Sequence, residues 1–280
     1  MSEKVHIEKG SVQETLMIPL FARAKCAELY PSIYSDPSAK RILDNVDYDM
    51  SQFERKARSF ITRYGYLEAA KRYSDMMIEI KEYLKDHPAA AIVNLGCGLD
   101  TTALQCDNGR CLFYNVDFPD VIAARNELVP PMERETNIAC DMLDTSWFDR
   151  IDSSGGAMFF AAGVFYYIKR DDVRRLFTEM AKRFPGGKIS FDSANEKACK
   201  MMLKTVIKGV GMNEVKVYLS ISDAQRELGP WSPDFTVTAK GYMTGYGTLK
   251  LPEISGFFRF VSRLSDRMFE MQIVSIRFAD

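Results

Sequence analysis

A short apolar run at residues 89–95 ends in two closely spaced glycines, Gly96 and Gly98. A nearly continuous apolar segment of this length suits the centre of a parallel sheet that is covered on both faces. Glycines directly after such a strand let the backbone come close to a ligand, because they carry no side chain to block the approach. The pattern predicts a strand, a turn and then a helix, with a ligand beyond the carboxyl end of the strand.

Strands and helices alternate from about residue 89 to residue 210, which predicts a doubly wound parallel sheet. We expect strands at residues 89–95, 111–118, 137–140, 157–162 and 188–192, and helices at residues 119–128 and 171–184. Helical periodicity comes before this unit, at residues 11–30, 38–45, 53–61 and 66–85. Residues 213–255 are predicted to be irregular or mixed, and a final strand is expected within residues 268–278.

An acidic residue, Asp117, ends the second predicted strand, 21 residues after Gly96. A carboxylate at that point can accept hydrogen bonds from both hydroxyl groups of a ribose. The alternatives are a solvated loop acid or a helix cap before Pro119. The glycine turn likewise has the alternative of an ordinary link between a strand and a helix.

Asp141 follows the third predicted strand and could accept from the amino group of an adenine, while the backbone of Met142 donates to the ring. A capping or loop aspartate is the alternative reading of Asp141. A dinucleotide site also requires a third glycine, and Thr101 occupies that position. The order of turn, ribose acid and adenine acid therefore matches S-adenosylmethionine better than a nicotinamide dinucleotide.

The charge and composition of the chain argue against several classes of binding partner. The chain has 280 residues, with 37 basic and 38 acidic side chains, so its formal net charge is −1. This balance disfavours nucleic acid as a partner. The sequence contains no apolar segment long enough for a membrane span and no signal-peptide pattern, so we expect no membrane partner and a cytoplasmic protein. The six cysteines form no CxxC pair, and we expect no metal site.

The chain has only two histidines, His6 and His87, and neither follows one of the predicted strands. Methylation of a hydroxyl group requires loss of a proton, for which histidine is the usual helper. A carboxylate is already ionised at pH 7 and requires no base. The shortage of histidine therefore favours a carboxylate acceptor, although Tyr, Lys or Asp could act as the base for a hydroxyl.

Several blocks in a fixed order resemble the leucine carboxyl methyltransferase family, which includes polyketide-type O-methyltransferases. The resemblance is strongest in VNLGCGLDT and NVDFPDVIAARNEL, and it extends to ETLMIPLFARA, SDPSAKRI, HPAAAIVNLG and FFAAGVFYYI. It implies a class I, Rossmann-like methyltransferase with a mostly parallel seven-stranded sheet. One integrated domain is expected, with a helical cover at residues 1–86, a cofactor-binding core at residues 87–280 and an acceptor-side insertion at residues 200–255.

The resemblance also implies roles for individual residues. Gly96 would lie against the methionine part of the cofactor, Asp117 would hold the ribose, and Asp141 and Met142 would bracket the adenine. Arg72 resembles the basic residue that pairs with the cofactor carboxylate, with Lys71 as its rival. Arg23, in FARA, resembles a second basic residue near the cofactor or acceptor carboxylate, with a surface cation as the alternative. Apart from the resemblance, one of Tyr166 and Tyr167 could line the acceptor pocket, and so could Trp231, with core packing as the alternative.

The chain departs from the family at Ala162, where many members have a glutamate before the glycine of FFAAGVFYYI. The leading hypothesis is an S-adenosylmethionine-dependent O-methyltransferase that acts on a carboxylate or hydroxyl of a small, polyketide-like molecule. A protein carboxyl terminus is an alternative acceptor. The missing acid motivates a second hypothesis, a cofactor-binding module without turnover, and the shared fold leaves a third, a nicotinamide-dependent oxidoreductase.

Overall fold

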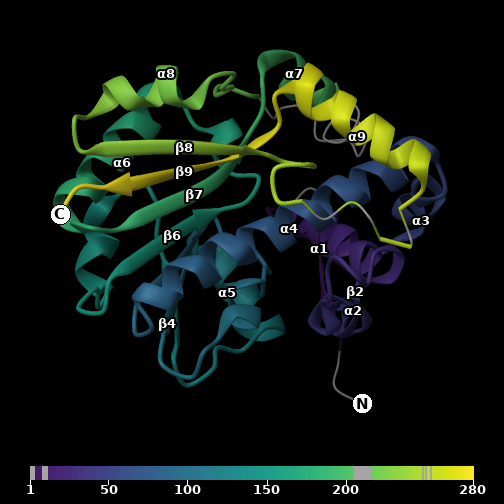
Figure 1. The fold of residues 1–280 in the computed structure, drawn as a ribbon. Helices are drawn as coiled ribbons and strands as arrows, with labels where there is room; N and C mark the ends of the chain where they lie inside the picture. Colours follow the sequence, from purple (N-terminus) through teal and green to yellow (C-terminus); the bar gives the residue numbers. More distant parts are fainter. Residues whose placement is uncertain (1–3, 8–11, 205–215, 248, 250, 253) are drawn as a thin grey trace.

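A seven-stranded sheet in the order β5-β4-β3-β6-β7-β9-β8 forms the centre of the molecule (Figure 1). The computed structural model describes residues 4–7, 12–204, 216–247, 249, 251–252 and 254–280. Neighbouring strands are parallel from β5 to β7, whereas β9 is antiparallel to β7 and to β8. This arrangement confirms the predicted fold class. The strands are β3 (Ala91–Leu95), β4 (Leu112–Asp117), β5 (Glu135–Ala139), β6 (Ala157–Ala161), β7 (Lys188–Ser193), β8 (Phe235–Gly241) and β9 (Gln272–Phe278).

Alternating side chains of the central strands pack against helices on both faces of the sheet. All residues of β3 and β6 are buried, as their apolar sequences require. Val93 and Phe159 join the core that includes α6 (Arg170–Arg183). Ile92 and Phe160 join a second core that includes the long helix α4 (Phe60–Asp86). Helix α5 (Pro119–Leu128) begins at a proline directly after β4, as predicted.

The predicted N-terminal helices are present as α1 (Val12–Leu29), α2 (Pro37–Asp44) and α3 (Ser51–Ala57). A short parallel pair, β1 (Val5–His6) with β2 (Val46–Asp47), lies beside them. Figure 1 shows α1–α3 and α9 gathered at one end of the sheet. That end is the carboxyl edge of the parallel strands, where doubly wound folds bind their ligands.

Three features differ from the sequence-based expectations, and part of one predicted segment is not described. The turn after β3 leads into a single 3-10 turn, η1 (Ala103–Cys106), rather than a longer helix. The segment expected to be irregular or mixed contains β8, a strand of the central sheet, together with α8 (Ala224–Leu228) and η6 (Gly229–Trp231). Helix α9 (Gly256–Phe269) was not predicted. Part of the predicted acceptor-side insertion, residues 205–215, lies outside the described residues.

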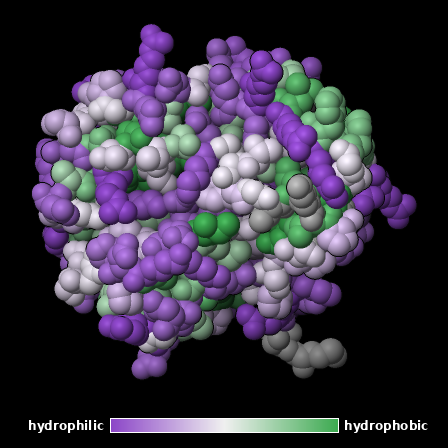
Figure 2. Space-filling model, viewed as in Figure 1, coloured by the Kyte–Doolittle hydropathy of each residue, from purple (hydrophilic) through white to green (hydrophobic). Residues whose placement is uncertain are grey.

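Helix α9 buries a mixed face, Phe258 with two serines, and exposes several large apolar side chains to solvent. Its exposed residues include Phe257, Phe260 and Leu264, whereas Ser262 and Ser265 are buried. Figure 2 shows hydrophobic surface in the upper right, where α9 lies. The serine hydroxyls therefore face the interior near the carboxyl ends of the strands. No helix in the described part of the chain is long and apolar enough to cross a membrane.

Candidate functional site

The turn after β3 presents bare backbone on two sides. Gly96 has φ +64° and Gly98 has φ +47°, a conformation that glycine adopts without strain. A Cβ atom on Gly96 would lie 2.8 Å from a methyl carbon of Val164, and one on Gly98 would lie 3.2 Å from a methyl carbon of Leu16. Any larger residue would therefore crowd this turn. Its two glycines meet both conditions of a ligand cradle, a sharp bend and the absence of side chains.

Asp117 is joined to the turn by its carboxylate. One oxygen accepts a hydrogen bond from the amide of Gly98 at 2.8 Å, and the other accepts from the amide of Phe118 at 2.8 Å. Burial raises the pKa of Asp117, although both amides act in the opposite direction. Each carboxylate oxygen has a second lone pair, so the side chain can accept two further hydrogen bonds. The structure thus brings the predicted ribose acid to the predicted turn.

Asp141 and Met142 follow β5, next to the end of β4. Asp141 is exposed, and its side chain accepts from the amide of Leu143 at 2.9 Å, so it caps its own turn. Met142 is buried, and its terminal methyl would lie 3.4 Å from a Cβ atom on Gly96. Met142 therefore borders the glycine turn, whereas Asp141 makes the capping hydrogen bond that was its alternative interpretation.

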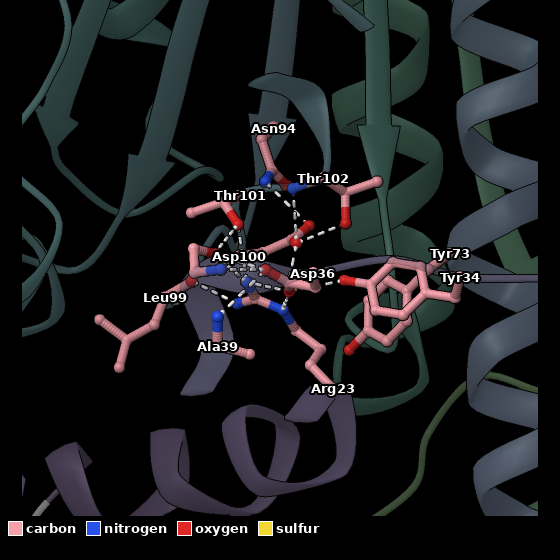
Figure 3. Close-up of polar contacts among 12 residues, drawn as sticks. Arg23, Tyr34, Asp36, Ala39, Tyr73, Asn94, Leu99, Asp100, Thr101 and Thr102 are labelled. Carbon is pink, nitrogen blue, oxygen red and sulfur yellow. Dashed lines mark hydrogen bonds and ion pairs between the residues drawn. The ribbon is translucent and has the colours of Figure 1, made fainter. Parts of the chain in front are cut away.

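Arg23 is buried and tied to protein groups on several sides (Figure 3). Its guanidinium donates to Asp36 at 2.7 Å, to the hydroxyl of Thr101 at 2.7 Å and to the carbonyl of Leu99. Asp36 in turn caps the start of α2. These bonds lock α1 and α2 onto the loop that follows the glycine turn. The structure therefore gives Arg23 a structural role, and its proposed contact with the cofactor or acceptor stays a prediction.

Arg72 and Lys71 are neighbours on α4 but point in different directions. Lys71 is fully buried and its ammonium group lies 2.7 Å from the carboxylate of Asp75. The Arg72 side chain is 18% exposed, and its guanidinium makes two long contacts of 3.4 Å, to Asp192 and to the hydroxyl of Tyr73. Its buried Nε has no hydrogen-bond partner among the described residues. Arg72 can therefore bind an anion, whereas Lys71 could do so only by giving up its buried ion pair with Asp75.

Asp192, at the end of β7, was missed by the sequence analysis. One of its oxygens accepts from the amide of Gly163 at 2.6 Å, and the other faces Arg72. A Cβ atom on Gly163 would lie 2.9 Å from Nη1 of Arg72, so Gly163 gives the guanidinium its space. The signal was available, since the predicted strand at residues 188–192 ends in this acid.

The remaining predicted residues divide between two places. Tyr166 and Tyr167 lie in η3 (Phe165–Tyr167), after Gly163, and Tyr166 packs in a small cluster with Ala194 and Cys199. Burial raises the pKa of Tyr166 far above its usual value. Trp231 lies just before β8, at the amino edge of the sheet, because the first residue of β8 pairs with the last residue of β9. The structure does not bring Trp231 to the glycine turn; it packs against Phe177.

The two histidines lie in different parts of the molecule, and neither contacts the glycine turn or Arg72 through a hydrogen bond or ion pair found in the described part of the chain. His6 is exposed in β1 and lies 3.1 Å from Asp47. His87 ends α4 at the opposite edge of the sheet, where its ring stacks on Tyr83 with the ring centres 4.4 Å apart. Both positions agree with the structural roles that the sequence suggested.

Comparison with known proteins identifies the family. A family model described as leucine carboxyl methyltransferase matches residues 17–181, which is more than half of the chain. The chain belongs to the leucine carboxyl methyltransferase family. It is therefore an S-adenosylmethionine-dependent methyltransferase rather than a nicotinamide-dependent oxidoreductase, and S-adenosylmethionine is its cofactor.

Two curated relatives of this methyltransferase cover about two thirds of it. The tetracenomycin polyketide synthesis O-methyltransferase TcmP of Streptomyces glaucescens is 27% identical over 188 residues, which cover 67% of each chain. The S-adenosyl-L-methionine-dependent methyltransferase dpfgK of Gibberella zeae is 28% identical over 211 residues, which cover 67% of this chain and 69% of the relative.

Solved structures share the fold of the methyltransferase at low sequence identity. A protein of Thermobifida fusca, provisionally assigned as a methyltransferase, superposes with a TM-score of 0.57 at 14% identity, covering 92% of this chain and 94% of that one. The plantazolicin methyltransferase BpumL superposes with a TM-score of 0.51 at 11% identity, covering 96% of this chain and all of that one. Both matches extend the agreement in fold to nearly the whole chain.

The residues at the carboxyl edge fit S-adenosylmethionine. Any side chain at position 96 would fill the space beside the turn, which glycine leaves open. Asp117 can still accept hydrogen bonds from ribose hydroxyls. Arg72 can still donate a hydrogen bond to a carboxylate. The glycine turn lies between Asp117 on one side and Val164, the residue after Gly163, on the other. The glycine turn, Asp117 and Arg72 could therefore hold the methionine chain, the ribose and the carboxylate of the cofactor, which stays a prediction for each of them.

Proposed function

We propose that this methyltransferase transfers the methyl group to a carboxylate oxygen of a small, polyketide-like molecule. The cofactor supplies an electrophilic methyl group for an in-line displacement. The protein then has to orient two reactants and to exclude water from them. Asp117 would hold the ribose, Arg72 would hold the cofactor carboxylate, and the glycine turn would admit the cofactor chain between them.

The described side chains that surround Arg72 carry the choice of acceptor, because none of them is placed to act as a base. Tyr73, Tyr166 and Tyr242 all interact electrostatically with Arg72, and burial raises the pKa of each of them. A tyrosine with a raised pKa stays protonated at neutral pH, so it can donate a hydrogen bond but cannot remove a proton. His87 lies at the opposite edge of the sheet and His6 is exposed on β1, so an acceptor that arrives already ionised fits these surroundings best. The relatives support the same class, since the family description names a carboxyl group and TcmP is named for a polyketide pathway.

Product chemistry tests the proposal directly. The protein is incubated with S-adenosylmethionine labelled in its methyl group and with a panel of aromatic carboxylic acids, matched phenols and a peptide with a free carboxyl terminus. The products are then treated with mild alkali, which cleaves methyl esters and leaves methyl ethers intact. Alkali-labile label on the small acids is the expected result. Alkali-stable label on the phenols, or label on the peptide alone, would contradict the proposal.

A hydroxyl acceptor is the second candidate, because one carboxyl group could serve as a base. Burial raises the pKa of Glu68 to about 7, and its side chain accepts from the hydroxyl of Ser265 at 3.3 Å. Glu68 and Arg72 both interact electrostatically with the buried Tyr242. If hydroxyl groups are the substrates, Glu68→Gln abolishes ether formation; if carboxylates are, the variant keeps its methyl-ester activity.

A further inference from the structure

Arg72 and Asp192 form an unusually loose pair of opposite charges. Strong hydrogen bonds between a guanidinium and a carboxylate measure about 2.7–2.9 Å, whereas the contact from Arg72 to Asp192 measures 3.4 Å. Arg23 offers a contrast in the same molecule, since its guanidinium lies 2.6 Å from the carboxylate of Asp36. Arg72 and Asp192 therefore lie side by side without satisfying each other.

The surroundings keep this pair from closing. Asp192 is held by the amide of Gly163 at 2.6 Å, and its side chain is only 3% exposed. Arg72 is held from the other side by Tyr73, whose ring centre lies 5.0 Å from the guanidinium carbon. Its Nε, buried and without a partner among the described residues, adds an unsatisfied donor. A buried donor without a partner is costly, so the arrangement calls for a ligand that satisfies it.

A zwitterion is the ligand that satisfies both halves of such a pair. An α-amino acid group carries a carboxylate and an ammonium on one carbon atom, and these two charges require a cation and an anion placed next to each other. Ala162, which precedes Gly163, offers only a methyl group, so the acid at this place comes from the neighbouring strand.

We infer that Asp192 binds the ammonium group of the cofactor's amino-acid end, next to the carboxylate that Arg72 binds. The inference rests on the proposed cofactor-binding role of Arg72 and extends it to a residue on β7. Through the amide of Gly163, Asp192 also fixes the start of the segment that carries Tyr166 and Tyr167. Asp192 thereby connects the cofactor side of the site with the predicted acceptor side.

Three ligands separate this role from a purely structural one. The first is S-adenosylhomocysteine, the second is its analogue with hydrogen in place of the amino group, and the third is its analogue with hydrogen in place of the carboxylate. Calorimetry measures the affinity of each ligand for the wild type, Asp192→Asn and Arg72→Gln. Asp149→Asn serves as the control, because that acid is 84% exposed and lies in a remote turn.

We expect Asp192→Asn to lose on the order of 30-fold in affinity for S-adenosylhomocysteine and for the analogue without the carboxylate, as expected when one partner of a buried charge pair is removed. Its affinity for the analogue without the amino group should match that of the wild type. Arg72→Gln should show the reverse selectivity between the two analogues.

Equal losses by Asp192→Asn for all three ligands would show that Asp192 only supports Arg72, and no loss for any ligand would also overturn the inference. Failure of the wild type to bind S-adenosylhomocysteine would instead contradict the proposed cofactor site, so the two failures are distinguishable. A thermal melt of each variant without ligand confirms that the protein is folded.

Discussion

The amide of Gly98 donates to the carboxylate of Asp117 across 2.8 Å, which makes the turn after β3 and the end of β4 a single structural unit. The turn would otherwise leave a part-buried amide without this partner. A ligand that binds Asp117 therefore also stabilises the conformation of the glycine turn. This coupling explains why the two features should respond together to mutation.

Asp117→Asn should weaken binding of S-adenosylhomocysteine by about 10-fold to 100-fold, because an amide replaces one of the two acceptor oxygens with a donor. The matched control is Asp120→Asn, an exposed acid in the first turn of α5. Calorimetric titration of both variants checks the prediction. Wild-type affinity in Asp117→Asn would exclude this carboxylate from the cofactor site.

Gly96→Ala should lower both stability and cofactor affinity. The new Cβ would meet Val164 at 2.8 Å, and the positive φ of Gly96 adds backbone strain. Combining it with Val164→Ala should restore part of the lost stability, because the clash is relieved while the strain remains. Urea unfolding of the two single variants and the double variant measures this coupling. Strict additivity would show that Val164 does not crowd the turn.

Arg23 and Arg72 should behave oppositely when each is replaced by lysine. Arg23→Lys removes a planar fork that satisfies several buried groups, so we expect a loss of roughly 2–4 kcal/mol in the free energy of unfolding. Arg72→Lys should leave the melting temperature within a few degrees of the wild type and reduce S-adenosylhomocysteine affinity at least about 10-fold. The opposite pattern would assign the cofactor carboxylate to Arg23.

The ionised carboxylate of Glu79 should stabilise the fold at neutral pH, and this stabilisation should be lost in acid. Burial alone would raise its pKa, but Lys188 and donors such as Tyr246 and Lys240 outweigh burial and lower the pKa to about 2. A depressed folded-state pKa contributes stability that is present above the unfolded value near 4.5 and is lost as the pH falls toward 2. The difference between these values corresponds to about 3 kcal/mol.

Glu79→Gln should therefore be less stable than the wild type by about this amount at pH 7, and the gap should narrow as the pH falls from 4.5 toward 2. Urea unfolding across this range tests the sign. Glu82→Gln, on the same helix and on the surface, is the control. A stability difference between the wild type and Glu79→Gln that grows as the pH falls would contradict the lowered pKa of Glu79.

Strand ends were the most informative part of the sequence. The apolar runs before Gly96 and Asp117 identified buried parallel strands, whose carboxyl ends must meet at one edge. Asp192 obeys the same rule, but no glycine turn or characteristic spacing marks it in the sequence. Sequence spacing also could not choose between Lys71 and Arg72. Adjacent helical residues point about 100° apart, and only packing shows which one faces the site.

The second half of the chain was harder to predict for a physical reason. Helix α9 buries Phe258 together with two serines and exposes Phe257 and Phe260, so its apolar residues do not mark a single inner face. Strand β8 lies at the edge of the sheet, and its outward residues include Thr238 and Lys240. An edge strand buries few residues and therefore has little apolar signal.

Calorimetric titration of the wild-type protein with S-adenosylhomocysteine tests the central claim most directly. We predict one binding site per chain with micromolar or tighter affinity, and no heat of binding from a nicotinamide dinucleotide under the same conditions. Absence of binding by S-adenosylhomocysteine, or binding of the dinucleotide in its place, would contradict the account of the cofactor site at the carboxyl edge of the sheet.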